Sequence, residues 1–207
     1  MQPSTAKLWA KQNRHEGDRW RLFSALAGAF EATTVLYPGC YVDIAPSFVF
    51  ESVTYVDIDK RAPKFFADVD GVEEIIAGHD GPSDPDITFI HADYTSPLDL
   101  PEDHFDLLIS LYAGFISEHC TQHLRVGGTL LVNPSHGDVA MASIDPRYEL
   151  AGVVNAKNGA YRVDSSGLEQ HLVPKKAQAI TVDSLHATNR GIGYTTSPFA
   201  YLFTRIA

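Results

Sequence analysis

Five short runs rich in β-branched and aliphatic residues recur in the middle of the chain, and segments of helical spacing lie between several of them. The runs cover residues 33–37, 53–57, 87–90, 105–110 and 129–132. Strands that alternate with helices are typical of βαβ units, which build a parallel sheet with helices on both faces. The sequence therefore predicts an α/β fold with a doubly wound, mostly parallel sheet over residues 33–134.

Helices are expected before this core and between its strands. Residues 4–31 carry apolar side chains at helical spacing with charges between them, and Gly17 is a point at which they can divide into two helices. Residues 60–77 are predicted as one helix. Asp43 is expected to be the N-cap of a short helix with Pro46 in its first turn.

The last strands of the core and the C-terminal segment follow other patterns. A short helix over residues 116–124 and a turn at 126–128 are predicted before the fifth run. After residue 134, two strand-like runs flank Asn158-Gly159, which is a strong hairpin signal. A helix over residues 181–190 and a strand over 198–206 complete an expected antiparallel addition to the sheet.

Nothing in the sequence marks a boundary between domains. We expect one domain over 1–207, with a helical extension (1–31), a cofactor-binding core (33–134) and C-terminal strands with a helix (135–207).

Charge and composition exclude several classes of partner. The 207 residues carry a formal net charge of −10, which repels phosphate backbones and anionic lipids, so neither nucleic acid nor a membrane is expected. No apolar run reaches the roughly 20 residues that span a bilayer. The only cysteines, Cys40 and Cys120, are too few for a disulfide framework. These features predict a cytoplasmic protein.

The ends of the first two strands carry a cofactor signal. Ligands of doubly wound sheets bind outside the carboxyl ends of the strands. Asp57 comes 18 residues after Gly39, near the spacing of roughly 20 at which an acid accepts hydrogen bonds from ribose hydroxyls. The alternatives are that Asp57 caps the next helix, or that Asp59 on the same face takes this role.

Five segments in this order resemble the class I S-adenosylmethionine-dependent methyltransferases over residues 33–134. The segments are Val-Leu-Tyr-Pro-Gly at 35–39, Val-Thr-Tyr-Val-Asp-Ile-Asp at 53–59, His-Ala-Asp-Tyr at 91–94, Leu-Pro-Glu-Asp-His-Phe-Asp-Leu-Leu-Ile-Ser at 100–110 and Leu-Arg-Val-Gly-Gly-Thr-Leu-Leu-Val at 124–132. The resemblance implies a Rossmann-like fold and S-adenosylmethionine as cofactor. It places the ribose acid on Asp57 and the partner of the adenine amine on Asp93.

The loop after the first strand departs from the family pattern of one acid and three alternating glycines. Tyr37 stands for the acid, and Tyr41 and Asp43 stand for the second and third glycines. We hypothesise that Asp43 or Tyr37 anchors the amino-acid end of the cofactor. The predicted cofactor-binding residues are Tyr37, Gly39, Cys40, Tyr41, Asp43, Asp57, Ile58, Asp93, Tyr94 and Ser110.

Several of these residues have simpler alternatives. Ile58 or Tyr94 would contact the ring face of adenine, but both types are also ordinary packing residues. Cys40 is interpreted as a small packing residue rather than a reactive thiol.

Two residues after the later strands are candidates for the acceptor side. Tyr112 follows the fourth strand as a pocket wall, and His136 follows the fifth, where a histidine suits a general base near neutral pH. A surface or capping histidine is the alternative for His136. Glu118, His119 and His123 lack a metal-binding pattern and are interpreted as a solvated helix face, so no metal is expected.

The function predicted from these patterns is methyl transfer from S-adenosylmethionine to a small molecule. The alternative is a non-catalytic domain of the same fold that binds a nucleoside ligand or a protein partner. A nicotinamide dehydrogenase is disfavoured because no Gly-x-Gly-x-x-Gly follows the first strand. Members of the resembled family that methylate amines or bases often carry Asn-Pro-Pro-Tyr after the fourth strand. This chain has Ser110-Leu111-Tyr112-Ala113 there, so methylation of DNA adenine is not expected. The sequence does not specify the acceptor or the oligomeric state.

Overall fold

The computed structural model describes residues 1–79, 81–177 and 179–207. Residue 80 of a predicted loop and residue 178 of the C-terminal segment lie outside the described part. The chain divides into two compact units, Met1–Leu98 and Asp99–Ala207, and both combine helices with strands.

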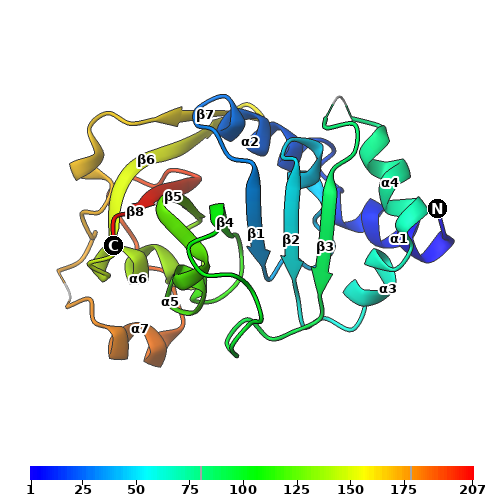
Figure 1. Ribbon diagram of the computed structural model, residues 1–207. Helices are drawn as coiled ribbons and strands as arrows, with labels where there is room; N and C mark the ends of the chain where they lie inside the picture. The colour runs from blue at the N-terminus through cyan, green and yellow to red at the C-terminus, as the bar shows by residue number, and fades with distance from the viewer. Residues whose placement is uncertain (80, 178) are drawn as a thin grey trace. The chain divides into compact units, whose positions relative to one another are not determined.

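The first unit holds three parallel strands in the order β3-β2-β1. Figure 1 shows them as neighbouring arrows that point the same way. In their register Leu36 lies opposite Thr54, and Thr54 lies opposite Thr88. The elements of this unit are α1 (Pro3–Gln12), α2 (Asp18–Ala27), β1 (Thr34–Pro38), η1 (Ala45–Phe48), β2 (Ser52–Val56), α3 (Ala62–Phe66), α4 (Val69–Ala77) and β3 (Asp86–Ile90).

Two predictions about the helices of this unit have different outcomes. The division of the N-terminal segment is confirmed, because Gly17 takes a φ of 70° immediately before α2. The single helix predicted over 60–77 is wrong, since α3 and α4 are separate. The break occurs at Asp68, whose carboxylate accepts the backbone N–H of Gln2 at 2.7 Å and so ties this turn to the start of α1.

The second unit combines a parallel pair with antiparallel strands. β4 runs parallel to β5, and the order β5-β8-β6-β7 is antiparallel throughout. The elements are β4 (Phe105–Ser110), α5 (Ile116–Cys120), η2 (Thr121–His123), β5 (Leu124–Val132), α6 (Asp138–Ile144), β6 (Tyr148–Lys157), β7 (Ala160–Asp164), η3 (Leu168–Gln170), α7 (Val182–Thr188) and β8 (Ala200–Arg205). The predicted α/β class, with parallel strands and an antiparallel C-terminal addition, is confirmed.

The turns of this unit show where local signals suffice. The hairpin is confirmed, because Asn158 and Gly159 both have positive φ, at 53° and 75°, as a tight two-residue hairpin turn requires. The turn predicted at 126–128 is wrong, since these residues belong to β5. The pairing of β5 with β4 shifts register there, between Phe105 and Leu107. Gly127 and Gly128 therefore lie in an irregular part of the strand rather than in a turn. Helix α6 was not predicted.

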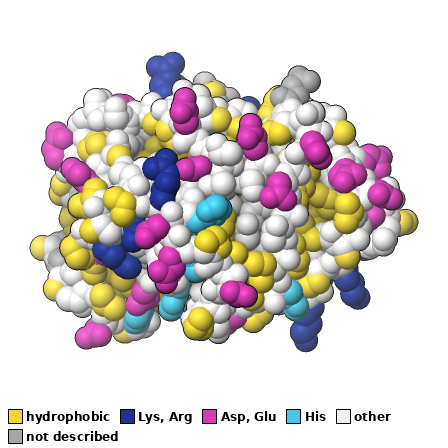
Figure 2. Space-filling model, viewed as in Figure 1, with side chains coloured by type: hydrophobic (Ala, Val, Ile, Leu, Met, Phe, Trp, Pro, Cys, Tyr) yellow, Lys and Arg dark blue, Asp and Glu magenta, His cyan; other side chains and the backbone are white. Residues whose placement is uncertain are grey.

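The surface carries no large basic region on the face shown in Figure 2, where acidic side chains are scattered and Lys and Arg are fewer. This distribution agrees with the net charge of −10. Among the described residues, no helix has the length and apolar character needed to cross a membrane.

One glycine of the second unit is held by close packing. A Cβ at Gly191 would lie 2.1 Å from the carbonyl oxygen of Pro134, whereas a Cβ at Gly193 would meet only the end of the Lys175 side chain at 3.9 Å. We therefore expect Gly191→Ala to lower the free energy of unfolding by about 1–3 kcal/mol, because backbone must move to relieve the clash. The matched variant Gly193→Ala should stay within about 0.5 kcal/mol of the wild type in urea unfolding. Equal stability of the two variants would contradict the close approach.

Candidate functional site

The predicted cofactor-binding residues of the first unit gather at one edge of its sheet. β1, β2 and β3 are parallel, so their carboxyl ends, at Pro38, Val56 and Ile90, share an edge. Backbone bonds fix the segments that follow: Gly39 N–H donates to the Val56 carbonyl at 2.8 Å, and Asp57 N–H donates to the Ile90 carbonyl at 3.2 Å. The loop after β1, Asp57 with Ile58, and Asp93 with Tyr94 all leave the sheet at this edge.

Asp57 is the centre of this group. Its Oδ2 accepts the backbone N–H of Tyr41, and its Oδ1 accepts that of Asp59, both at 2.6 Å. The side chain therefore joins the loop after β1 to the turn after β2. A carboxylate offers about four lone-pair sites. Two remain for other donors, so the half-buried Asp57 retains the capacity to accept two hydroxyl hydrogens.

The reserve candidate Asp59 is committed to another partner. Arg61 donates to its two oxygens through Nε at 2.8 Å and Nη2 at 2.6 Å, and these bonds lower the pKa of Asp59 to about 2. The same guanidinium lies over the ring of Tyr41, 4.7 Å from its centroid. Asp57 is thus the carboxylate better placed to accept bonds from a ligand.

The other loop acid lies in a buried polar cluster. Asp43 is 1% exposed, and its Oδ2 lies 3.4 Å from Nε of Arg19 and accepts the Tyr37 hydroxyl at 3.3 Å. Burial raises the pKa of Asp43, and the Arg19 guanidinium opposes this rise. Arg19 comes from α2, so the N-terminal helices supply a charge to the strand-end loop. Sequence reasoning missed Arg19 because nothing in its helical surroundings distinguishes it from a solvated arginine.

Local geometry corrects one expectation about Asp43. The short helix η1 is a 3-10 helix that starts at Ala45, and its N-cap position is Ile44 rather than Asp43. The Asp43 carboxylate still accepts the Ala45 N–H at 3.3 Å, and Pro46 lies in the first turn as predicted.

The remaining residues of this edge differ in accessibility. Ile58 is 63% exposed, so its apolar side chain is open to solvent at this edge. Asp93 binds the backbone N–H and the hydroxyl of Thr95, at 2.9 and 2.8 Å, and Tyr94 is half-buried. Burial, followed by the charge of Asp57, raises the pKa of the Cys40 thiol far above its usual value, which fits a packing residue.

In the second unit, Ser110 is part of a buried network around Asp138. The Ser110 hydroxyl, at the end of β4, donates to one oxygen of Asp138, and the Ser117 hydroxyl from α5 donates to the other. Asp138 is the first residue of α6 and links these elements. The sequence contained a signal for it, because Gly137-Asp138 precedes an apolar run and so marks a helix start.

Burial raises the pKa of Asp138 to about 6, despite the hydrogen bonds from the two serines. The folded carboxyl therefore binds its proton more tightly than the unfolded one, whose pKa is 3.8. Its contribution to stability is fully present below pH 4 and is lost as the pH rises through about 6, with a limit of about 3 kcal/mol. In urea unfolding at pH 4 to 7, the wild type should show this loss and Asp138→Asn should not. Parallel pH profiles of the two proteins would contradict it.

The acceptor-side candidates both have an unusual backbone. Tyr112 and His136 have φ angles of 58° and 59°, in the left-handed region that non-glycine residues seldom adopt. Both side chains are exposed, Tyr112 at 54%. Asn133 connects their loops, since its Oδ1 accepts the Tyr112 N–H at 3.2 Å and the Ser135 hydroxyl at 2.7 Å. Strained backbone of this kind is frequent at functional sites.

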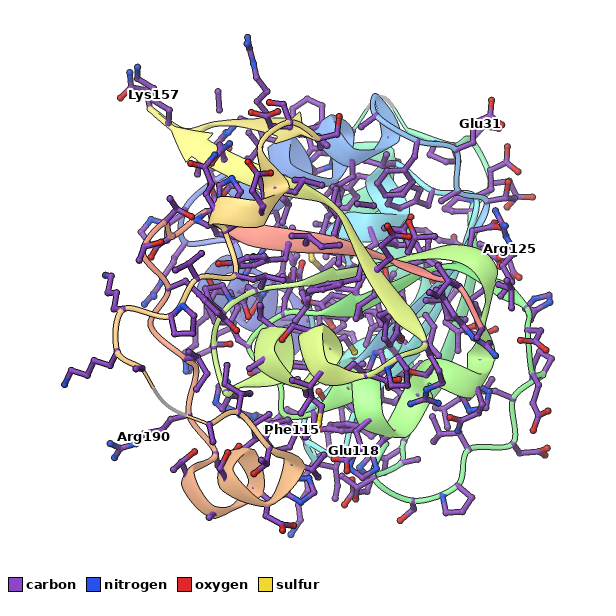
Figure 3. The ribbon with its side chains drawn as sticks, turned by 90° about the vertical axis from the view of Figure 1, so that its left-hand side faces the viewer. Glu31, Phe115, Glu118, Arg125, Lys157 and Arg190 are labelled. Atoms are coloured by element: carbon purple, nitrogen blue, oxygen red, sulfur yellow. The ribbon has the colours of Figure 1, made fainter. Side chains whose placement is uncertain are left out.

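Glu118 and His123, which were considered as metal ligands, bind other residues. Glu118 accepts a hydrogen bond from His186 Nε2 at 2.8 Å, and Figure 3 shows Glu118 and Phe115 beside α7. His123 is buried and donates through Nδ1 to the Pro101 carbonyl at 3.0 Å. Within the described ranges, no group of three or more His, Cys, Asp or Glu side chains could hold a metal ion.

A cavity of about 570 Å³ lies elsewhere in the first unit, between α4 and the residues that lead into β3. Phe66, Ile76 and His79 are among its lining residues. It lies beside the start of β3, whereas the predicted cofactor-binding residues follow the strand ends. None of them lines it.

Comparison with known proteins identifies the fold. No protein-family model and no curated protein matches this sequence. A solved structure of a protein named as an O-methyltransferase from Klebsiella pneumoniae aligns with 100% of this chain and 91% of its own, at 12% identity and a TM-score of 0.53. In a complex with the Haloferax volcanii Trm112 methyltransferase activator, a protein named as a methyltransferase aligns over 96% of this chain and 95% of its own, at 13% identity and a TM-score of 0.51.

A third structure, of a protein named as an S-adenosyl-L-methionine-dependent methyltransferase from Methanococcus maripaludis, aligns with 63% of this chain at 11% identity and a TM-score of 0.47. The alignment spans 61% of that relative, which is less than two thirds of its length. The two alignments with TM-scores of 0.51 and 0.53 carry the comparison, and at 13% and 12% identity they concern the fold alone. The chain has the Rossmann-like fold of the S-adenosylmethionine-dependent methyltransferases.

Proposed function

We propose that this chain, given its methyltransferase fold, binds S-adenosylmethionine and transfers its methyl group to a small molecule. The observation that carries the proposal is Asp57, which lies at the end of β2 and holds the loop after β1 through the Tyr41 N–H at 2.6 Å. An acid in this position can accept hydrogen bonds from ribose hydroxyls. The net charge of −10 disfavours a nucleic acid as acceptor.

The residues present fit the nucleoside part of the cofactor. Asp57 has acceptor capacity left for the ribose, and the exposed Ile58 next to it offers an apolar surface for a base. Asp93, which leaves the sheet at the same edge, would accept the adenine amine, and Tyr94 would contact the ring. The loop that begins at Gly39 would hold the amino-acid end, where Asp43 already accepts the Tyr37 hydroxyl and pairs with Arg19.

When bound, S-adenosylmethionine supplies a methyl group on a positively charged sulfur. A nucleophile attacks the methyl carbon in line with the carbon–sulfur bond, and the sulfur leaves as S-adenosylhomocysteine. Positioning provides most of the rate of such a displacement. In this proposal the exposed Tyr112 forms a wall against the acceptor, and His136 takes its proton where the acceptor atom carries one. Asn133 fixes both loops through its side-chain oxygen.

A second candidate is a non-catalytic domain that binds a nucleoside ligand or a protein partner. It is favoured by a specific observation: both oxygens of Asp57 already accept backbone hydrogens, and a tyrosine rather than a small residue occupies position 41. The two candidates differ in turnover, not in fold.

Calorimetric titration tests the proposal. S-adenosylmethionine and its product S-adenosylhomocysteine should bind with one site per chain, and NAD should not. At 100 times its Kd a ligand of the native state adds about 2.7 kcal/mol to stability, so thermal unfolding provides an independent readout. Transfer of a labelled methyl group to an acceptor from a panel of phenols, amines and carboxylic acids would distinguish an enzyme from a binding domain. If neither cofactor form binds, the proposal is wrong.

A further inference from the structure

Four residues at the ends of β1 and β2 form a closed cycle of contacts. Asp57 accepts the backbone N–H of Tyr41, whose ring lies under the guanidinium of Arg61, 4.7 Å from the ring centroid. Arg61 donates to both oxygens of Asp59. The backbone N–H of Asp59 donates to Asp57 at 2.6 Å, which closes the cycle. Each residue has contacts to two others of the cycle. None of the four can therefore leave its place without breaking two interactions.

Tyr41 is held in this cycle at a local cost. Its φ of 53° is in the left-handed region, which favours glycine. Its hydroxyl is buried and has no hydrogen-bond partner among the described residues. A glycine at this position would adopt the same backbone without strain and would still donate its N–H to Asp57. The tyrosine ring is therefore not needed to orient Asp57.

The ring is also poorly placed to bind a ligand directly. Its polar end is buried, and one of its faces is covered by Arg61. What remains is the volume that the ring fills, and the backbone N–H of the same residue donates to the carboxylate that would accept a ribose. Arg61 lies over the ring and is itself held by two hydrogen bonds to Asp59, and these contacts keep the ring in that volume.

We infer that Tyr41 determines the affinity of the strand-end site for ribose-containing ligands, because its ring closes the space beside Asp57 until the stack with Arg61 opens. The inference rests on the proposed function, since it concerns the same site. When only the open fraction of a protein binds, the apparent affinity is the intrinsic affinity multiplied by that fraction. Changes that open the cycle should then tighten binding, although they remove protein contacts.

Two substitutions at one position give opposite expectations. Tyr41→Gly removes the ring and the strain and keeps the N–H to Asp57, so S-adenosylhomocysteine should bind about 10-fold more tightly, with a faster association rate in surface plasmon resonance. Tyr41→Phe removes only the buried hydroxyl without a partner, which stabilises the closed form. This variant should melt at a higher temperature than the wild type and bind the ligand several-fold more weakly.

Arg61→Ala provides a second route to the open form and should tighten binding about 3-fold. Its matched control is Arg125→Ala in the second unit, which breaks an exposed ion pair between Arg125 Nε and Asp106 Oδ1 at 2.6 Å. This variant should leave the affinity for S-adenosylhomocysteine unchanged. If circular dichroism shows that Tyr41→Gly does not fold, Arg61→Ala and Tyr41→Phe still show whether opening the cycle raises or lowers the affinity for S-adenosylhomocysteine.

The outcomes separate this inference from the proposed function. If the wild type binds S-adenosylhomocysteine and the opened variants bind it equally or more weakly, the ring is a wall of the site or a bystander, and the inference is overturned. If neither the wild type nor any variant binds it, the proposed function fails and the inference fails with it. Binding by the opened variants alone would support the inferred role of Tyr41, while the proposed function of the wild-type chain would fail.

Discussion

Replacing Asp57 with alanine should weaken the binding of S-adenosylmethionine about 100-fold or more. The carboxylate would accept two ribose hydroxyls, and each hydrogen bond to a charged group contributes about 1.5–3 kcal/mol. A loss of about 3 kcal/mol corresponds to about 100-fold in Kd. The substitution also removes the acceptor of two backbone N–H groups, from Tyr41 and Asp59, so the free energy of unfolding should fall by about 1–3 kcal/mol. Calorimetric titration and urea unfolding measure the two effects.

The control for this experiment is an aspartate at the opposite ends of the same strands. Asp86 starts β3 and accepts the Ser52 hydroxyl at 3.1 Å on the exposed surface. Asp86→Ala should leave cofactor affinity within a factor of about two, because surface substitutions rarely change more than about 0.5 kcal/mol. Wild-type affinity in Asp57→Ala would show that this carboxylate does not bind the ribose, and the observation that carries the proposed function would be lost.

The largest expected effect on stability is at Arg19. Arg19→Met should lower the free energy of unfolding at pH 8 by about 3–5 kcal/mol, because it leaves the buried Asp43 carboxylate without its cation. Burial already raises the pKa of Asp43, and loss of the guanidinium should raise it further. A carboxyl whose pKa is raised in the folded state loses stability as the pH rises above its unfolded pKa. The defect of Arg19→Met should therefore be smaller at pH 5 than at pH 8.

The double variant Arg19→Met with Asp43→Asn is the control, since it removes the charge along with its partner. Most of the lost stability should return, and the difference between pH 5 and pH 8 should disappear. A defect in Arg19→Met that is the same at both pH values would show that packing of the long side chain, rather than charge, is what Arg19 provides. Asp43→Asn alone also tests the hypothesis for the amino-acid end, because unchanged cofactor affinity would exclude Asp43 as an anchor.

Much of the fold could be predicted because local signals agreed with the tertiary structure. The β-branched runs became β1 to β5, and Asn158-Gly159 became a tight hairpin because only residues tolerant of positive φ fit such a turn. Gly17 divided the N-terminal helices for the same reason. Asp57 could be assigned to the edge of the sheet because parallel strands bring their carboxyl ends together.

Other features depended on contacts between distant segments. The helix over 60–77 was broken at Asp68 by a bond to Gln2, which lies 66 residues away in the sequence. Asp138 and Ser110 were brought together across 28 residues, and the local pattern around each did not indicate the other. The placements of Tyr112, Asp93 and His136 were predicted, but their roles at the site remain proposals.

By itself, the sequence determined the five core strands, the tight turn at Asn158-Gly159 and which end of β2 carries an acid, because these follow from side-chain periodicity and from backbone preferences of single residues. Only the tertiary structure decided what each polar group binds. Arg19 became the partner of Asp43, because burial removes water and leaves the carboxylate to a cation that folding brings close. Tyr41 became part of a closed cycle with Arg61, because folding places the guanidinium over its ring.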